Sequence, residues 1–154
     1  MPQRLRFRLE TLLRVRHLME ERKATALAGV RRQVRAAEVQ RADIIREQMR
    51  MLDEAGQLTH EEFDAADVRR YYQYERYLAR QAVEKDALLM ELRGKEVAQR
   101  AELEEAMKRK RIIERLKERH EAAQVLALVK FDQWQSDEVA VNAAAVARRY
   151  RGEL

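Results

Sequence analysis

The sequence predicts an all-α protein, a long antiparallel two-helix coiled-coil hairpin with a short extra helical segment near the turn. Three observations predict this fold. The 154 residues include one proline and four glycines, so few positions interrupt a helix. Charged residues make up 38% of the chain and aromatic residues only 6%, a composition typical of coiled coils. Apolar residues also recur three and four positions apart, which indicates a narrow line of contact between helices, here called the seam.

The first helix is predicted over about residues 5–54. Apolar residues three and four positions apart form its seam, and Arg41 and Gln48 occupy the remaining positions of the same stripe. The apolar members are Leu27, Val30, Val34, Ala37, Ile44, Met51 and Ala55. An upstream stripe is offset from it and consists of Leu5, Leu9, Leu12, Val15 and Met19. We therefore expect the seam to change face near Gly29, an isolated glycine that a helix tolerates.

The turn is predicted at about residues 55–59. Gly56 is expected to end the first helix in the left-handed conformation, which glycine adopts without steric cost. Thr59 is expected to cap the next helix, because Glu62 follows three residues later as its capping-box partner. The sequence thus marks a single reversal of the chain.

The second helical stretch is predicted over residues 60–149, within a single coiled-coil domain of residues 1–154. Its predicted seam includes Leu78, Ala82, Leu89, Leu92, Leu103, Ala106, Ile113, Ala127, Phe131, Trp134 and Val141. Because this stretch is longer than the first, we expect residues 60–82 to form a short helix around the turn. The two chain ends would then meet at the opposite end of the hairpin.

No residue pattern indicates catalysis. His17, His60 and His120 are scattered, without the spacing that places two metal ligands on one helix face. No glycine-rich phosphate loop is present, and no nucleophile has a base nearby in a known pattern. We therefore expect no enzymatic activity, no cofactor and no metal. Neither a signal peptide nor a transmembrane segment is predicted, so the chain is expected to be cytoplasmic.

Two segments suggest binding. Tyr71, Tyr74 and Leu78 share a helix face in an Arg-rich stretch, which is compatible with packing at the turn, protein docking or nucleic-acid stacking. The stretch from Lys108 to His120 is basic, but its interspersed glutamates favour a solvated coiled-coil face over a nucleic-acid patch. The net charge of +5 allows nucleic acid, anionic lipid or an acidic protein as partner.

Three segments together resemble the FliJ family of bacterial flagellar export. The opening segment is Phe7, Leu9-Glu10-Thr11-Leu12-Leu13 and Arg16. The basic segment is Arg109-Lys110-Arg111, Glu114, Leu116 and Glu118-Arg119, and the late one is Asp137-Glu138-Val139-Ala140. The order of the segments and the chain length also match the family. The apolar run Val125–Val129 departs from it, since the family is more polar there.

The resemblance implies an antiparallel coiled coil similar to the central stalk of rotary ATPases, with no catalytic residues. It implies binding to the hexameric export ATPase ring and to the cytoplasmic domain of the export gate membrane protein. It also implies recycling of export chaperones, and a cytoplasmic location peripheral to the inner face of the cell membrane. A stalk protein of a virulence-type secretion system, or a basic coiled-coil scaffold or nucleic-acid-binding protein, is the alternative; nucleic acid is the less expected partner.

Under this resemblance, two sets of residues are expected to bind partners. The set for the ATPase ring combines basic residues from both chain ends with apolar anchors, and comprises Arg6, Phe7, Arg8, Leu12, Leu13, Arg16, Arg148 and Arg149. The set for the export gate lies at the turn end, and comprises Gln40, Ile44, Met51, Tyr71, Tyr74 and Leu78.

Overall fold

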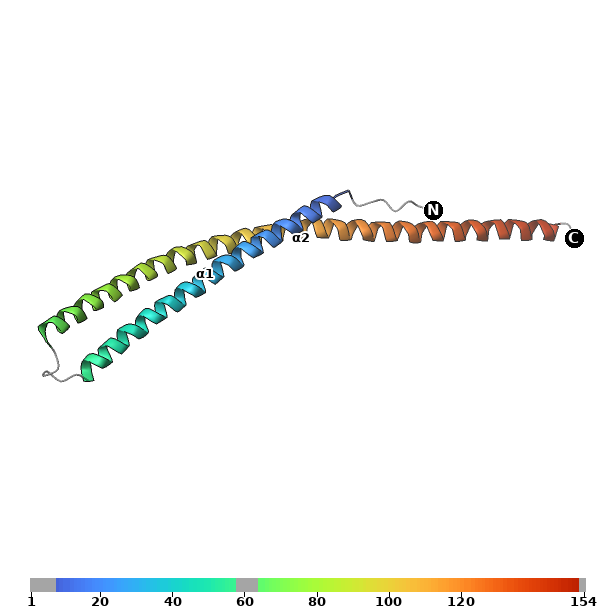
Figure 1. The fold of residues 1–154 in the computed structure, drawn as a ribbon. Helices are drawn as coiled ribbons and strands as arrows, with labels where there is room; N and C mark the ends of the chain where they lie inside the picture. The colour runs from blue at the N-terminus through green and yellow to red at the C-terminus, as the bar shows by residue number, and fades with distance from the viewer. Residues whose placement is uncertain (1–7, 58–63, 153–154) are drawn as a thin grey trace. The chain divides into compact units, whose positions relative to one another are not determined.

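The computed structural model describes residues 8–57 and 64–152, and within these ranges the chain consists of two helices (Figure 1). Helix α1 spans Glu10–Gln57 and helix α2 spans Ala65–Gly152, 88 residues without a break. No strand occurs in the described part of the chain. The predicted all-α hairpin of two long helices packed against each other is confirmed.

The helix ends near the turn differ from the sequence prediction. Gly56 lies inside α1, and none of the described glycines has a positive φ, so the predicted left-handed ending at Gly56 is wrong. The helix simply continues through it, at the modest cost of a helical glycine. Asp64 takes the N-cap position of α2, since its carbonyl oxygen accepts the backbone N–H of Val68 at 3.1 Å. Thr59 and Glu62 lie outside the described residues.

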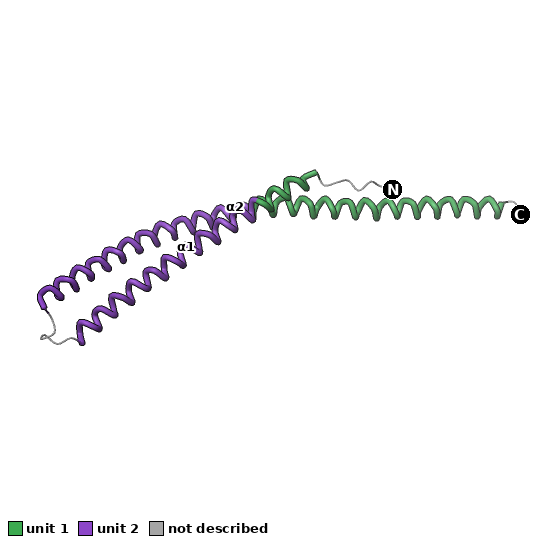
Figure 2. Tube along the Cα trace, viewed as in Figure 1, with its two compact units in different colours: residues 1–18, 107–154 green, residues 19–106 purple. Residues whose placement is uncertain are grey.

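The chain divides into two compact units, which Figure 2 shows in different colours. Unit 2 comprises residues 19–106, where α1 and α2 lie side by side in opposite directions. Its core consists of Val34, Ala37, Leu89 and Leu92, with Val30 packed against them. None of the described side chains is completely shielded from solvent, as expected of a seam only one residue wide on each helix.

The predicted seam of unit 2 is confirmed on both helices. On α1, Leu27, Val34, Ala37 and Met51 are buried, and the half-buried positions Val30, Arg41, Ile44, Gln48 and Ala55 complete an alternation of threes and fours. On α2, Leu78, Ala82, Leu89 and Leu92 are buried, and Leu103 is half-buried. Half-buried polar residues, such as Lys85 and Glu96, fill the other seam positions of α2.

Ion pairs between the helices fix the antiparallel register of unit 2. Arg31 Nε lies 3.0 Å from Glu96 Oε1, and Arg41 Nε lies 2.7 Å from Asp86 Oδ1. In both pairs the two residue numbers add up to 127, as expected when the helices run in opposite directions with one constant register. Each pair joins a seam position to a position beside the seam, so the charged groups lie along the edges of the apolar core and separate it from solvent.

Unit 1 comprises residues 1–18 and 107–154, described over 8–18 and 107–152. Ile113 is buried there, and Lys117 Nζ lies 3.1 Å from Glu10 Oε2, again with residue numbers that add up to 127. The predicted offset stripe is wrong at Val15 and at Met19, which are 42% and 46% exposed. The half-buried positions follow the unshifted alternation instead, through Leu13 and Arg16. The period of the coil decides the seam here, not the hydrophobicity of single residues.

The extra length of α2 lies at its C-terminal end, not around the turn as the sequence suggested. Residues 65–82 belong to the hairpin, because Leu78 is buried and the Tyr74 hydroxyl reaches Glu47 on α1. Every described residue from Val125 onward is exposed, so the predicted seam residues Ala127, Phe131, Trp134 and Val141 are not covered. Antiparallel pairing starts at the turn, and the longer helix must therefore run past the shorter one at the open end. Residues 118–152 of α2 are called the overhang below.

The predicted meeting of the two chain ends is consequently wrong. Glu10, at the start of α1, forms an ion pair with Lys117. Arg148 follows Lys117 by 31 residues on the same helix, which corresponds to about 47 Å along the axis at 1.5 Å per residue. The basic residues at the start of α1 and those at the end of α2 thus form two separate groups.

Candidate partner-binding surfaces

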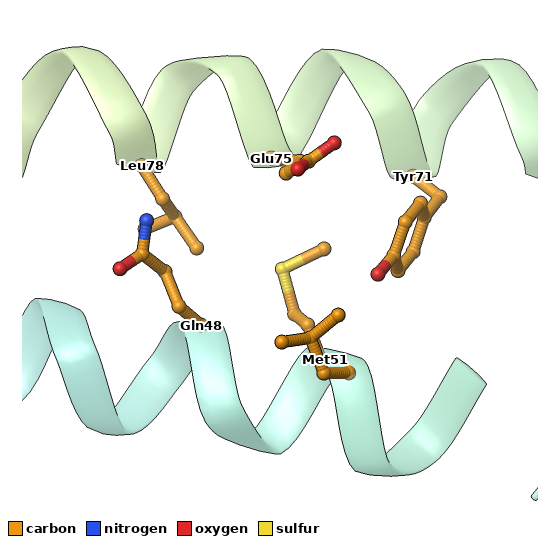
Figure 3. Close-up of a pocket in the computed structure, with 6 residues that line it drawn as sticks. Gln48, Met51, Tyr71, Glu75 and Leu78 are labelled. Atoms are coloured by element: carbon orange, nitrogen blue, oxygen red, sulfur yellow. The ribbon is translucent and has the colours of Figure 1, made fainter. Parts of the chain in front are cut away.

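A shallow pocket opens between the two helices near the turn end of unit 2 (Figure 3). Its volume is about 250 Å³, and its lining comes from Gln48, Met51, Leu52, Tyr71, Glu75 and Leu78. Figure 3 shows the Met51 side chain reaching from α1 into the space between the helices, and Leu78 reaching toward it from α2. The pocket marks a point where the seam loosens before the turn.

Few of the residues predicted for the export gate offer free surface. Met51 is 9% exposed and Leu78 is 5% exposed, so both belong to the helix–helix seam. Ile44 and Tyr71 are half-buried beside them. Gln40 is exposed, but its Oε1 accepts a hydrogen bond of 2.7 Å from Lys85 Nζ. Tyr74 is the only member of the set that presents an aromatic ring to solvent.

Tyr74 is held in place by neighbours on both helices. Its hydroxyl donates to Glu47 Oε1 on α1 at 3.1 Å, and its ring stacks on Tyr77 with centroids 6.0 Å apart. The hydrogen bond to the Glu47 carboxylate raises the pKa of Tyr74, because the phenolate would repel that charge. Arg50 lowers the pKa of Glu47 through its own hydrogen bond, which keeps the acceptor ionised. Two tyrosine rings therefore form an ordered platform on this side of the seam.

The opposite side of the seam carries an apolar patch that the sequence prediction missed. Ile45, Leu52 and Tyr72 are exposed by 36%, 65% and 56%, and each directly follows a seam residue. In unit 2, the residues that directly follow a seam residue lie on the same side of the seam on both helices. Glu38, which follows Ala37, and Arg93, which follows Leu92, show this because they form an ion pair of 3.1 Å. These three residues are called the turn-side patch. Reading the residue after each seam position would have found it.

Charge is unevenly divided between the units. Unit 1 contains 16 Lys and Arg against 8 Asp and Glu, a net charge of +8. Unit 2 contains 16 Lys and Arg against 19 Asp and Glu, a net charge of −3. The whole positive excess of the chain therefore belongs to unit 1, and an acidic partner would be attracted to that unit alone.

The residues predicted for the ATPase ring fall into separate places. Arg6 and Phe7 lie outside the described residues. Arg8, Arg148 and Arg149 are exposed, and the structure does not bring Arg8 to the other two. The three remaining members, Leu12, Leu13 and Arg16, are half-buried. The apolar anchors thus belong partly to helix packing, and the exposed basic groups occupy both the start of α1 and the end of the overhang.

The overhang contains, at Val125–Val129, a run that is apolar on every side of the helix. Val125, Leu126, Leu128 and Val129 are exposed by 59%, 61%, 43% and 50%. Five consecutive apolar residues, with Ala127 between these four, cover more than one full helical turn. A helix that is apolar all round is normally enclosed by its surroundings. This run is therefore a candidate contact for a partner that encircles α2.

The described residues offer little for other chemistry. No group of three or more His, Cys, Asp or Glu side chains within residues 8–57 and 64–152 could hold a metal ion. Neither described helix is long and apolar enough to cross a membrane.

Among known proteins, the chain matches a family model but no single relative. No curated protein and no solved structure matches the chain. The model of the family described as Flagellar FliJ protein matches residues 5–149, nearly the whole chain. That family provides a component of the flagellar export apparatus. The chain therefore belongs to the FliJ family.

Proposed function

We propose that this FliJ-family protein is the central stalk of the flagellar type III export ATPase, and that it couples the ATPase ring to the export gate. Unit 1 would bind the hexameric ring, and the turn end of unit 2 would bind the cytoplasmic domain of the gate protein. The protein would work at the inner face of the cell membrane and would also assist the recycling of export chaperones. It would contribute position and contacts, with no catalysis of its own.

The observation that carries the proposal is the segregation of charge between the two units. A net charge of +8 in unit 1 favours an acidic partner there, and a net charge of −3 in unit 2 does not. A stalk that must enter a ring with one end and leave the other end free needs this asymmetry. The exposed apolar run Val125–Val129 supports the same end, since a ring can cover a helix on all sides.

Charge reversal at two arginine pairs tests the ring-binding end. Arg148→Glu with Arg149→Glu changes the overhang, and Arg69→Glu with Arg70→Glu is the matched control in unit 2, where both arginines are also exposed. The overhang variant should associate with the ATPase about tenfold more slowly at low salt, because charge steering acts mainly on the association rate. The difference should shrink as salt is added. Equal rates for both variants across salt concentrations would refute the assignment of unit 1 to the ring.

The turn-side patch and the tyrosine platform are the proposed contacts for the export gate. Aromatic side chains are enriched at protein interfaces, and Leu52, Tyr72 and Tyr74 are exposed by 65%, 56% and 41%. Replacing both Leu52 and Tyr72 with Ala should weaken gate binding, with ATPase binding unchanged. The control is Val83→Ala with Met90→Ala, a double change of side chains that are 68% and 81% exposed elsewhere in unit 2. If the control weakens gate binding as much as the patch variant does, the patch is not the contact.

A nucleic-acid-binding scaffold is the second candidate, and the net charge of unit 1 is the observation that favours it. Binding to phosphates releases counterions, so DNA affinity should fall steeply as salt rises. A gel-shift titration at several salt concentrations distinguishes the two functions. DNA binding that survives physiological salt, together with no binding to the ATPase, would favour the scaffold.

A further inference from the structure

The seam of α2 does not stop where α1 stops. The alternation of threes and fours that runs through Leu89 and Ile113 continues unbroken along the overhang. Its members there are Ala127, Phe131, Trp134, Glu138, Val141, Ala145 and Arg148. Trp134 is 62% exposed and Val141 is 67% exposed, and the rings of Phe131 and Trp134 lie 6.4 Å apart along this stripe. A stripe with the period of the existing coiled coil indicates another helix as its occupant.

The order of charges on the overhang makes it complementary to itself. Asp137 and Glu138 precede Arg148 and Arg151, and none of the four has an ion-pair partner within the described chain. If two overhangs run in opposite directions, the acidic pair of each faces the basic pair of the other. If they run in the same direction, Glu138 faces Glu138 and Arg148 faces Arg148, and like charges repel.

We propose that the overhang pairs with the overhang of a second copy of this chain, in an antiparallel coiled coil. In this register, Glu138 in the seam faces Arg148 of the second copy, and Asp137 beside the seam faces Arg151 of the second copy. Trp134 meets Gly152 of the second copy, where the absent side chain leaves room for the indole ring. Two-fold symmetry repeats every contact, as in most homodimers.

If the protein acts as the proposed stalk, the pairing competes with entry into the ATPase ring; this competition rests on the proposed function. The face that pairs with a second copy lies in the overhang, which is the part of α2 proposed to enter the ATPase ring. The two states therefore exclude each other. The free protein would be a dimer with covered overhangs, and the ring would bind the monomer.

A charge exchange across the pair tests the proposal on the full-length chain, by sedimentation equilibrium without the ATPase. Glu138→Arg alone places Arg opposite Arg, and Arg148→Glu alone places Glu opposite Glu. Each variant should dimerise about tenfold more weakly than the unchanged protein, because two-fold symmetry replaces two attractive pairs with two repulsive ones. An equimolar mixture of the two variants should dimerise again, because the arginine introduced in one variant then faces the glutamate introduced in the other.

Oxidative cross-linking gives an independent test, since the chain contains no native cysteine. Position 144 would lie beside the symmetry axis, so Ala144→Cys should form a disulfide-linked dimer. Position 143 points away from the partner, so Ala143→Cys is the matched control and should form no disulfide link, although it should still dimerise. The proposal is overturned if both cysteine variants cross-link equally. It is also overturned if the unchanged protein is monomeric at all concentrations, or if the mixture of the two charge variants is no more dimeric than each variant alone. None of these outcomes depends on whether the ATPase binds.

Discussion

Leu89 and Leu88 are neighbours in sequence with opposite environments, and their comparison tests the seam of unit 2. Leu89 is 7% exposed and packs in the core cluster, while Leu88 is 37% exposed. Leu→Ala in a core costs about 2–5 kcal/mol, from lost burial and from the cavity that remains. The seam is narrow and open to water on both sides, so water can fill the space left behind. We therefore expect Leu89→Ala to cost about 2 kcal/mol, the lower end of that range.

Urea unfolding followed by circular dichroism measures this difference directly. About 2 kcal/mol corresponds to an unfolding equilibrium constant roughly 30-fold larger, which is easily resolved. Leu88→Ala should cost clearly less than Leu89→Ala, about 1 kcal/mol or below, because more of the Leu88 side chain already lies in water. The substitution is chemically identical in the two variants, so intrinsic helix propensity cancels. Equal losses at both positions would show that the register of the hairpin differs from the one described.

The remaining predictions concern the same unit. Gly94→Ala should stabilise the protein by about 0.5–1 kcal/mol in the same urea assay, because a Cβ at this helical position meets no atom within 4 Å; a loss would contradict the open surroundings. Arg41→Leu should raise stability by about 1 kcal/mol, because it replaces a half-buried cation in the seam and leaves the exposed Asp86 hydrated; a clear loss would show that the ion pair is a net stabilising contact. Glu47→Gln should lower the pKa of Tyr74 toward its ordinary value, as followed by NMR of labelled tyrosine. Because the folded pKa of Tyr74 is raised, its contribution to stability is present below pH 10 and is lost as the pH rises through the folded value; an unchanged pKa in the variant would exclude Glu47 as the cause.

The sequence was sufficient to predict the fold class because the two helices carry a regular apolar period. Leu27, Val34 and Ala37 on α1, and Leu89 and Leu92 on α2, were all predicted in the seam and are buried. The seam position of Arg16 was not predicted, because the predicted stripe followed the more hydrophobic residue Val15 and not the regular spacing of three and four residues. Polar residues in a seam can be recognised only after the register is known, and the register depends on contacts between distant parts of the chain.

The position of the extra length could not be predicted from the pattern of α2 alone. Its alternation of threes and fours is the same at Leu78, which is buried, and at Val141, which is exposed. A periodic stripe shows that a helix can pack, but it does not identify the partner that covers it. The location of the turn decides which part of α2 is covered by α1, since pairing proceeds outward from the turn until α1 ends. The same limit explains why Met51 and Leu78 were expected at a docking surface and instead lie between the helices.

Hydrogen exchange with and without the export ATPase hexamer tests the central claim most directly. A single helix without tertiary contacts exchanges its amides quickly, so the overhang should be weakly protected when the protein is alone and dilute. Binding to the ring should slow exchange along residues 118–152, and the turn end around Tyr72 should remain unchanged. Slowed exchange at the turn end, with no change along the overhang, would contradict the account of unit 1 as the end that enters the ATPase ring.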